Sequence, residues 1–204
     1  GAAMTRLVDA VLFDYGGVLC RDQSARDRRA IEAAVGVEDP DRFWAEYWSL
    51  RRPYDEGTLS PADYWNRVVG TDVGDRLDAI EAVDVASWSH PYEETLALAR
   101  RLSGRGTRLA LLSNCPEPMA VAIDGMSWSD LIPDRFYSCR LGLTKPDPTI
   151  YHKVLTALGA RPQDVTFVDD RPPNVAAAAA LGMRALLFTD PATLAADLDL
   201  QGDA

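Results

Sequence analysis

Short apolar runs, separated by stretches with helical spacing, organise most of this chain. The runs cover residues 7–13, 109–112, 165–168 and 185–188, and a weaker one lies at 136–137. Stretches whose apolar residues recur at helical spacing precede three of the runs, at residues 95–106, 148–159 and 172–183. Strands that alternate with helices predict an α/β protein, with a Rossmann-like parallel sheet covered by helices on both faces.

The region after the first run contains no strand-like pattern for about 70 residues. Helices are expected there at residues 27–35, 41–50, 61–69 and 74–83, with proline at helix starts and glycine at helix ends as punctuation. Four aromatic residues share a helical spacing and are expected to form the core of this region: Phe43, Trp44, Tyr47 and Trp48. We predict a helical subdomain at residues 21–88, inserted into a core formed by residues 4–20 and 89–204.

Polar residues directly follow three of the predicted strands. Asp14 ends the first, Ser113-Asn114 ends the second, and Asp169-Asp170 ends the third long run. Ligands of parallel sheets bind at the carboxyl ends of the strands, so these residues are expected to share one site. Three adjacent carboxylates repel one another unless a cation lies among them, and oxygen-only ligands suit Mg²⁺. With Lys145 and Ser113 as partners for phosphate oxygens, the pattern predicts phosphoryl transfer.

Composition limits the partners that the protein can have. The 204 residues include 31 acidic and 21 basic side chains, a formal net charge of −10, which argues against nucleic acid or an anionic membrane as a partner. No apolar run approaches the roughly 20 residues of a membrane span, and the first residues lack a secretory signal pattern. Three scattered cysteines form no disulfide framework. We therefore expect a cytoplasmic protein with reduced thiols.

Four short segments give the chain a family resemblance: VLFDYGGVL at residues 11–19, LALLSN at 109–114, LTKPDP at 143–148 and VTFVDDRPPN at 165–174. In this order, they resemble the signatures of the haloacid dehalogenase-like (HAD) hydrolases, and the likeness covers essentially the whole chain. The helical insertion resembles the type 1 cap of that family. The double aspartate is similar to that of its sugar-1-phosphate phosphatases and of the phosphatase domain of soluble epoxide hydrolases. The resemblance implies a sheet order of 5-4-1-2-3.

The resemblance also implies roles for individual residues. Asp14 would attack the phosphorus of a small phosphorylated metabolite and form an aspartyl-phosphate, while Ser113 and Lys145 steady the phosphoryl oxygens. Mg²⁺ would be held by Asp14, Asp170 and the backbone carbonyl of Gly16. The remaining assignments are substrate binding by Gly16, Gly17 and Asn114, and support of the site by Asp169 and Asn174.

One position departs from the family pattern. Most phosphatases of the family carry a second aspartate two residues after the nucleophile, where it protonates the leaving group, and here that position is Gly16. A positioned proton donor contributes about 10²–10⁴-fold to rate. Three explanations stay open: a good leaving group that needs little help, a proton donor from the cap, or a catalytically feeble protein. Gly16→Asp should raise hydrolysis of alkyl phosphates if the missing acid limits the rate.

Two other functions compete with the phosphatase. A haloacid dehalogenase also resembles this fold and also lacks an acid at the position of Gly16, but it has little use for the paired Asp169 and Asp170 so near its nucleophile. A non-catalytic protein that binds a phosphorylated ligand or a partner through the cap is the third hypothesis. Outside the signatures, Arg51 and Arg52 are expected to form a solvated, charged corner.

Overall fold

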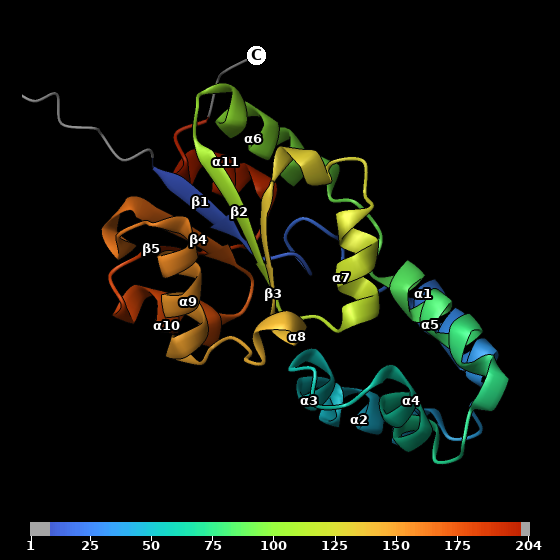
Figure 1. Cartoon of the computed structure of the whole chain (residues 1–204). Coiled ribbons are helices and arrows are strands. Elements are labelled where there is room, and N and C mark those ends of the chain that lie inside the picture. Colours follow the sequence, from blue (N-terminus) through green and yellow to red (C-terminus); the bar gives the residue numbers. More distant parts are fainter. Residues whose placement is uncertain (1–8, 201–204) are drawn as a thin grey trace, which may run out of the picture.

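Five parallel strands form a single sheet in the computed structural model, which describes residues 9–200 (Figure 1). The strands are β1 (Ala10–Phe13), β2 (Arg108–Ser113), β3 (Asp134–Tyr137), β4 (Val165–Asp169) and β5 (Arg184–Leu187). Their order across the sheet, β3-β2-β1-β4-β5, confirms the predicted order counted from the other edge. Strand β1 is central and pairs with both β2 and β4, so Asp14 emerges between the ends of these two strands.

Successive residues of β1 point to opposite faces of the sheet, so both faces carry apolar side chains. Helices cover both of these faces. Val11 and Phe13 belong to the hydrophobic cluster formed with α6 (Glu93–Gly104), α7 (Glu117–Asp124) and α11 (Pro191–Asp197). Ala10 and Leu12 belong to the cluster formed with α9 (Pro148–Leu158) and α10 (Pro172–Ala180). The predicted α/β class is therefore confirmed. Apolar spacing does not predict α7 or α11, since each has only about two turns.

Residues 25–87 form the helical segment between β1 and α6. It contains α1 (Ala25–Val35), α2 (Pro40–Ser49), α3 (Arg51–Asp55), α4 (Pro61–Val69), a 3₁₀ turn (Gly74–Arg76) and α5 (Leu77–Ser87). Side chains of Ser24, Asp39 and Ser60 cap the first, second and fourth helices. The segment has a hydrophobic cluster of its own, which includes the predicted Phe43, Trp44 and Tyr47. Trp48 departs from that prediction, because it is 44% exposed and lines a cavity.

The helical segment contacts the rest of the protein at two places: α5 contacts α7, and the C-terminal end of α3 lies next to α8 (Ser138–Leu141) in Figure 1. The Ser138 hydroxyl donates a hydrogen bond to the carbonyl oxygen of Asp55 at 2.6 Å. The Thr144 hydroxyl donates to Glu56 Oε1 at 3.2 Å. Gly57 has a φ of 79°, and a Cβ there would lie 2.6 Å from the carbonyl oxygen of Cys139. Only glycine permits this close approach of the two backbones.

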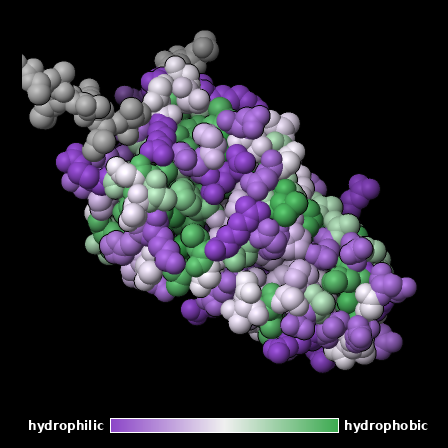
Figure 2. All heavy atoms as spheres, viewed as in Figure 1, coloured by the Kyte–Doolittle hydropathy of each residue, from purple (hydrophilic) through white to green (hydrophobic). Residues whose placement is uncertain are grey.

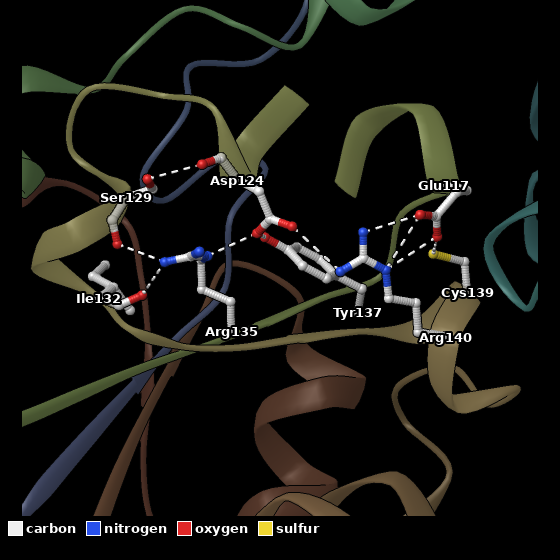
Figure 3. A network of polar contacts seen from close by, with 8 residues as sticks. All are labelled: Glu117, Asp124, Ser129, Ile132, Arg135, Tyr137, Cys139 and Arg140. Carbon is white, nitrogen blue, oxygen red and sulfur yellow. Dashed lines mark hydrogen bonds and ion pairs between the residues drawn. The ribbon is translucent and has the colours of Figure 1, made fainter. Parts of the chain in front are cut away.

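A polar network fixes α8 against α7 and β3 (Figure 3). Arg140 of α8 reaches Glu117 at 3.0 Å and Asp124 at 3.3 Å, both on α7. Asp124 also accepts hydrogen bonds from Arg135 at 2.8 Å and from the Tyr137 hydroxyl at 2.6 Å, both on β3. The surface on which α3 docks is thus tied to the sheet by charge-assisted hydrogen bonds.

The outer surface is mixed in polarity. Hydrophilic side chains cover most of the face shown in Figure 2, and the hydrophobic ones lie in small separate patches. Within residues 9–200, every helix is too short or too polar to span a lipid bilayer.

Candidate active site

The side chains of Asp14 and Lys145 meet at the carboxyl edge of the sheet. The backbone N–H of Asp14 donates to the carbonyl oxygen of Val168 at 2.9 Å, which extends the pairing of β1 with β4 by one residue. Lys145 Nζ donates to Asp14 Oδ1 at 2.8 Å, to Asp169 Oδ2 at 2.9 Å and to the carbonyl oxygen of Leu112 at 2.8 Å. All three donor positions of the ammonium group are therefore used within the protein.

Burial dominates the electrostatics of this pair. Burial would lower the pKa of Lys145, but the carboxylates of Asp14 and Asp169 raise it above its ordinary value, so the side chain stays a cation. Burial also raises the pKa of Asp14; Lys145 opposes this shift, while Asp169 and Asp170 add to it. Three carboxylates against one ammonium group leave a local formal charge of −2.

Asp169 is fully buried behind Lys145 and uses both of its oxygens within the protein. Oδ1 accepts from the backbone N–H of Arg171 at 2.9 Å. Oδ2 accepts from Lys145 and from Asn174 Nδ2, the latter at 3.1 Å. Asp169 thus holds the ammonium group of Lys145, and Asn174 holds Asp169; the supporting role of these two residues stays a prediction.

Asp170 differs from Asp169 in having an oxygen to spare. Its Oδ1 is buried and has no hydrogen-bond partner within the described residues. Burial, and then the nearby carboxylate of Asp169, raise the pKa of Asp170. Carboxylate oxygens of Asp14, Asp169 and Asp170, one from each residue, lie within 4.8 Å of one another. A buried oxygen without a donor, beside a net negative charge, fits a bound cation, and an all-oxygen set suits Mg²⁺.

Gly17 provides the space that Asp170 occupies. Its φ of 81° lies in the left-handed region, and a Cβ at this position would overlap Asp170 Oδ2. Gly16 differs, since a Cβ there would lie at an ordinary distance of 3.8 Å from Cζ3 of Trp88. Gly17 packs under the carboxylate, whereas Gly16 faces the cavity.

Ser113 ends β2, and Asn114 begins the loop after it. Ser113 is buried at the end of the strand and lines the cavity. The Asn114 side chain forms a reciprocal pair with the backbone of Lys145, donating from Nδ2 at 3.1 Å and accepting at Oδ1 at 2.9 Å. Asn114 therefore fixes Lys145 next to this loop, a contact that adds to the substrate binding predicted for it.

A cavity of about 660 Å³ opens above these groups. Asp14, Gly16, Ser113, Asn114, Lys145, Asp170 and Asn174 line it, so seven of the nine predicted site residues share one space, while Gly17 and Asp169 lie behind it. Residues of the helical segment or its exit close the cavity from the other side: Trp48, Arg51, Arg52, Asp55 and Trp88. The volume is within the range of pockets for small molecules.

The sequence pattern wrongly predicts that Arg51 is solvated, and it does not identify Asp55 as a residue of the site. Arg51 is not a solvated residue: its guanidinium is buried and pairs with Asp84 at 3.1 Å, and its cation lies over the rings of Tyr47 and Tyr64. Asp55 follows one turn later, with Oδ1 at 3.7 Å from Arg51 Nε. The i,i+4 spacing of Arg51 and Asp55 is the signal that these two side chains share a face.

Comparison with known proteins agrees with this arrangement. The family described as haloacid dehalogenase-like hydrolase matches residues 8–182. A sesquiterpene phosphatase of Aspergillus oryzae is 28% identical over 184 residues, which cover 89% of this chain and 90% of that protein. A flavin mononucleotide hydrolase of Arabidopsis thaliana is 33% identical over 137 residues, which cover 52% of this chain and 56% of that protein.

Solved structures share the fold at lower identity. A HAD family enzyme of Bacteroides thetaiotaomicron superposes with a TM-score of 0.75 at 20% identity, covering 89% of this chain and 94% of that one. Its complex with magnesium and inorganic phosphate gives a TM-score of 0.72 at 21% identity, with the same coverage of 89% and 94%. A 2-haloacid dehalogenase of Pseudomonas syringae gives a TM-score of 0.64 at 18% identity, covering 97% and 89%. At these identities the structures establish the fold and leave the choice of reaction to the site itself.

Proposed function

The chain belongs to the haloacid dehalogenase-like hydrolases, and from that membership we propose that it is a Mg²⁺-dependent phosphatase acting on a small phosphorylated metabolite. The observation that carries the proposal is the placement of Asp14. Its carboxylate is held by Lys145 and lies beside the unpartnered oxygen of Asp170, at the floor of a cavity of about 660 Å³. The phosphatase and hydrolase relatives support the same reaction class.

Asp14, Asp170 and the backbone carbonyl of Gly16 are the groups that would hold the metal. When bound, Mg²⁺ supplies positive charge where a carboxylate must meet a phosphate dianion. The unpartnered Oδ1 of Asp170 and the surplus of negative charge are the features of this chain that suit it. Asp169 is a poorer ligand, because both of its oxygens already accept hydrogen bonds.

Asp14 is the nucleophile in this proposal. The backbone N–H of Tyr15 and the ammonium of Lys145 both donate to Oδ1, each at 2.8 Å, and so fix the orientation of the carboxylate. The carboxylate forms a bond to phosphorus as the bond to the leaving oxygen breaks, which gives an aspartyl-phosphate and releases the alcohol. Water then attacks phosphorus, which releases inorganic phosphate and restores Asp14.

Lys145 and Ser113 position the phosphoryl group during this displacement. Asp169 holds the Lys145 ammonium from behind, while the Asn114 amide pins the Lys145 backbone. Ser113 lines the cavity at the end of β2. The three N–H groups of Lys145 are already used within the protein, so Lys145 acts here through its positive charge. A charge that is fixed before the substrate binds stabilises the phosphoryl oxygens without reorganisation during the reaction.

Residues 21–88 act as a cap in this proposal, over a core formed by residues 4–20 and 89–204, of which residues 4–8 and 201–204 lie outside the described part. The support is that the helical segment has its own hydrophobic cluster and contributes Trp48, Arg51 and Asp55 to the cavity wall. The leaving group would therefore face side chains of the cap, which would set the substrate range.

Chelation separates the phosphatase from the dehalogenase. We expect hydrolysis of phosphate esters to need added Mg²⁺ and to disappear with EDTA, whereas dehalogenation of a 2-haloacid needs no metal. The panel should contain sugar phosphates, nucleotides, acyl phosphates and 4-nitrophenyl phosphate. Asp14→Asn should abolish turnover, while Asp41→Asn, the same change at an exposed residue of α2, should not. Metal-independent turnover, or full activity of Asp14→Asn, would refute the proposal.

A further inference from the structure

The proton donor that most phosphatases of this family carry in the core is missing at Gly16. The indole of Trp88 lies against this position instead, at 3.8 Å from where a Cβ would be. Trp88 is held there at both ends: its Nε1 donates to the Tyr47 hydroxyl at 3.1 Å, and its carbonyl accepts from the Tyr15 hydroxyl at 2.5 Å. A leaving oxygen must therefore obtain its proton from another wall of the cavity.

Asp55 also lines the cavity, and its backbone is anchored to the loop after β2. The Ser138 hydroxyl donates to the carbonyl of Asp55 at 2.6 Å and accepts from the backbone N–H of Cys115 at 2.9 Å. One buried hydroxyl thus joins the end of α3 to a residue two positions after Ser113. Asp55 lines the same cavity as Asp14.

The loop after β4 contributes a positive charge near Asp55. Arg171, which follows Asp170 and lines the cavity, is close enough for its positive charge to lower the pKa of Asp55. Asp55 and Arg171 thus line the same cavity as Asp14, which follows β1 between β2 and β4.

We propose that Asp55 is the catalytic acid and base of the reaction, supplied by the helical segment in place of a core residue at position 16. This inference rests on the proposed phosphatase function. As the bond from phosphorus to the leaving oxygen breaks, the proton of the Asp55 carboxyl group passes to that oxygen, giving a neutral alcohol and the Asp55 carboxylate. The carboxylate then takes a proton from the water that attacks the aspartyl-phosphate, which restores Asp55 in its protonated form.

The surroundings of Asp55 favour the protonated form that a donor needs. Its Oδ1 is buried and has no hydrogen-bond partner within the described residues. Burial raises the pKa of Asp55 to about 7; Arg51 opposes the shift, and Asp84 adds to it. Arg51 opposes it only in part, because its guanidinium pairs more closely with Asp84, at 3.1 Å compared with 3.7 Å for Asp55. The charged and titratable groups that face Asp55 are Arg51 and Glu56 near it in the chain, Asp84 on α5, Cys115 after β2, and Arg171 after β4.

The test compares leaving groups of similar size and decreasing acidity: 4-nitrophenyl, phenyl and benzyl phosphate. We expect Asp55→Asn to reduce kcat/KM for benzyl phosphate by about 10²–10⁴-fold and for 4-nitrophenyl phosphate by at most a few-fold, since nitrophenolate departs without a proton. Asp41→Asn makes the same chemical change at an exposed residue of α2 and should alter neither rate. A purely structural role would lower all three rates by the same factor and would overturn the inference.

The pH profile of the unmodified protein gives a second readout that does not depend on a variant folding. The ratio of benzyl to 4-nitrophenyl hydrolysis should fall as pH rises through the neutral range, because the donor is then lost. A ratio that does not change with pH would overturn the inference while leaving the proposed function intact. Absence of Mg²⁺-dependent hydrolysis from the unmodified protein would instead refute the proposed function, and the inference with it.

Discussion

Replacement of Gly17 by alanine tests the geometry of the metal site with the smallest possible change. The φ of 81° at Gly17 places an L-residue in the left-handed region, and the new Cβ would overlap Asp170 Oδ2. A non-glycine residue in a sparsely populated backbone region costs about 1–3 kcal/mol. Asp170 is only partly buried and lines the cavity, so its carboxylate is the group that would shift to make room for the new Cβ. We therefore expect Gly17→Ala to displace the carboxylate that would hold Mg²⁺.

Gly16→Ala is the matched control, since its backbone lies outside the left-handed region and its Cβ would be in ordinary contact with Trp88, at 3.8 Å. Urea denaturation should show Gly17→Ala less stable by about 1–3 kcal/mol and Gly16→Ala within about 1 kcal/mol of the unmodified protein. Titration of activity with Mg²⁺ should show a weaker metal response in Gly17→Ala alone. Equal stability and equal Mg²⁺ dependence in the two variants would refute the inference that Gly17 is needed to make room for the Asp170 carboxylate.

Three further outcomes follow from the buried polar groups. Lys145→Met leaves two carboxylates without their shared cation and should lower the free energy of unfolding by about 3–5 kcal/mol, whereas the exposed Lys153→Met should not; equal urea midpoints would contradict this. Ser138→Ala removes the bridge to Asp55 and should cost about 1–3 kcal/mol in the same assay; an unchanged midpoint would show that the bridge contributes little. Because its pKa is raised to about 7, Asp55 destabilises the fold increasingly as pH rises from about 4 through 7. Asp55→Asn should therefore gain roughly 1–4 kcal/mol relative to the unmodified protein at pH 8 and little at pH 4; a gain that does not vary with pH would contradict the shift.

The sheet could be predicted because its strands are short, apolar and separated by long helices. Ala10 to Phe13 are buried on both faces, so they form a continuous apolar run that needs no tertiary information to identify. Strand β3 gives a weaker pattern because it lies at the edge of the sheet and three of its four residues are only partly buried. Helices α7 and α11 are too short for their apolar spacing to stand out.

The floor of the site could be predicted for a different reason. Asp14, Ser113 and Asp169 follow strands whose carboxyl ends must meet in a parallel sheet, so topology alone brings them together. Lys145 lies in a loop and is placed by contacts that sequence periodicity does not encode: its side chain is held by Asp14 and its backbone by Asn114.

The walls of the site could not be predicted in this way, since they depend on how the helical segment docks. Arg51 looks like a solvated residue because a second arginine, Arg52, follows it, yet its partner Asp84 comes from a helix about thirty residues later. Trp48 belongs to an aromatic stripe that is otherwise core, and only the position of the segment turns it toward the cavity. Local propensity determines where the helices form, and tertiary contacts determine which helix faces line the active site.

Gly16 and Trp88 lie next to each other when the helical segment is docked on the core. An aspartate at position 16 would place its carboxylate against the indole of Trp88, which lies 3.8 Å from where a Cβ would be. Exclusion of water strengthens the interactions of Lys145 with a phosphoryl group. With Asp55 as the proton donor, the acid belongs to the same segment as the covering ring. Protonation of the leaving oxygen then requires the helical segment to be docked on the core. A substrate that prevents docking would react in a site that is open to water and lacks the Asp55 proton donor. This coupling would favour substrates whose leaving group fits under Trp88 and Asp55 over smaller esters with equally poor leaving groups.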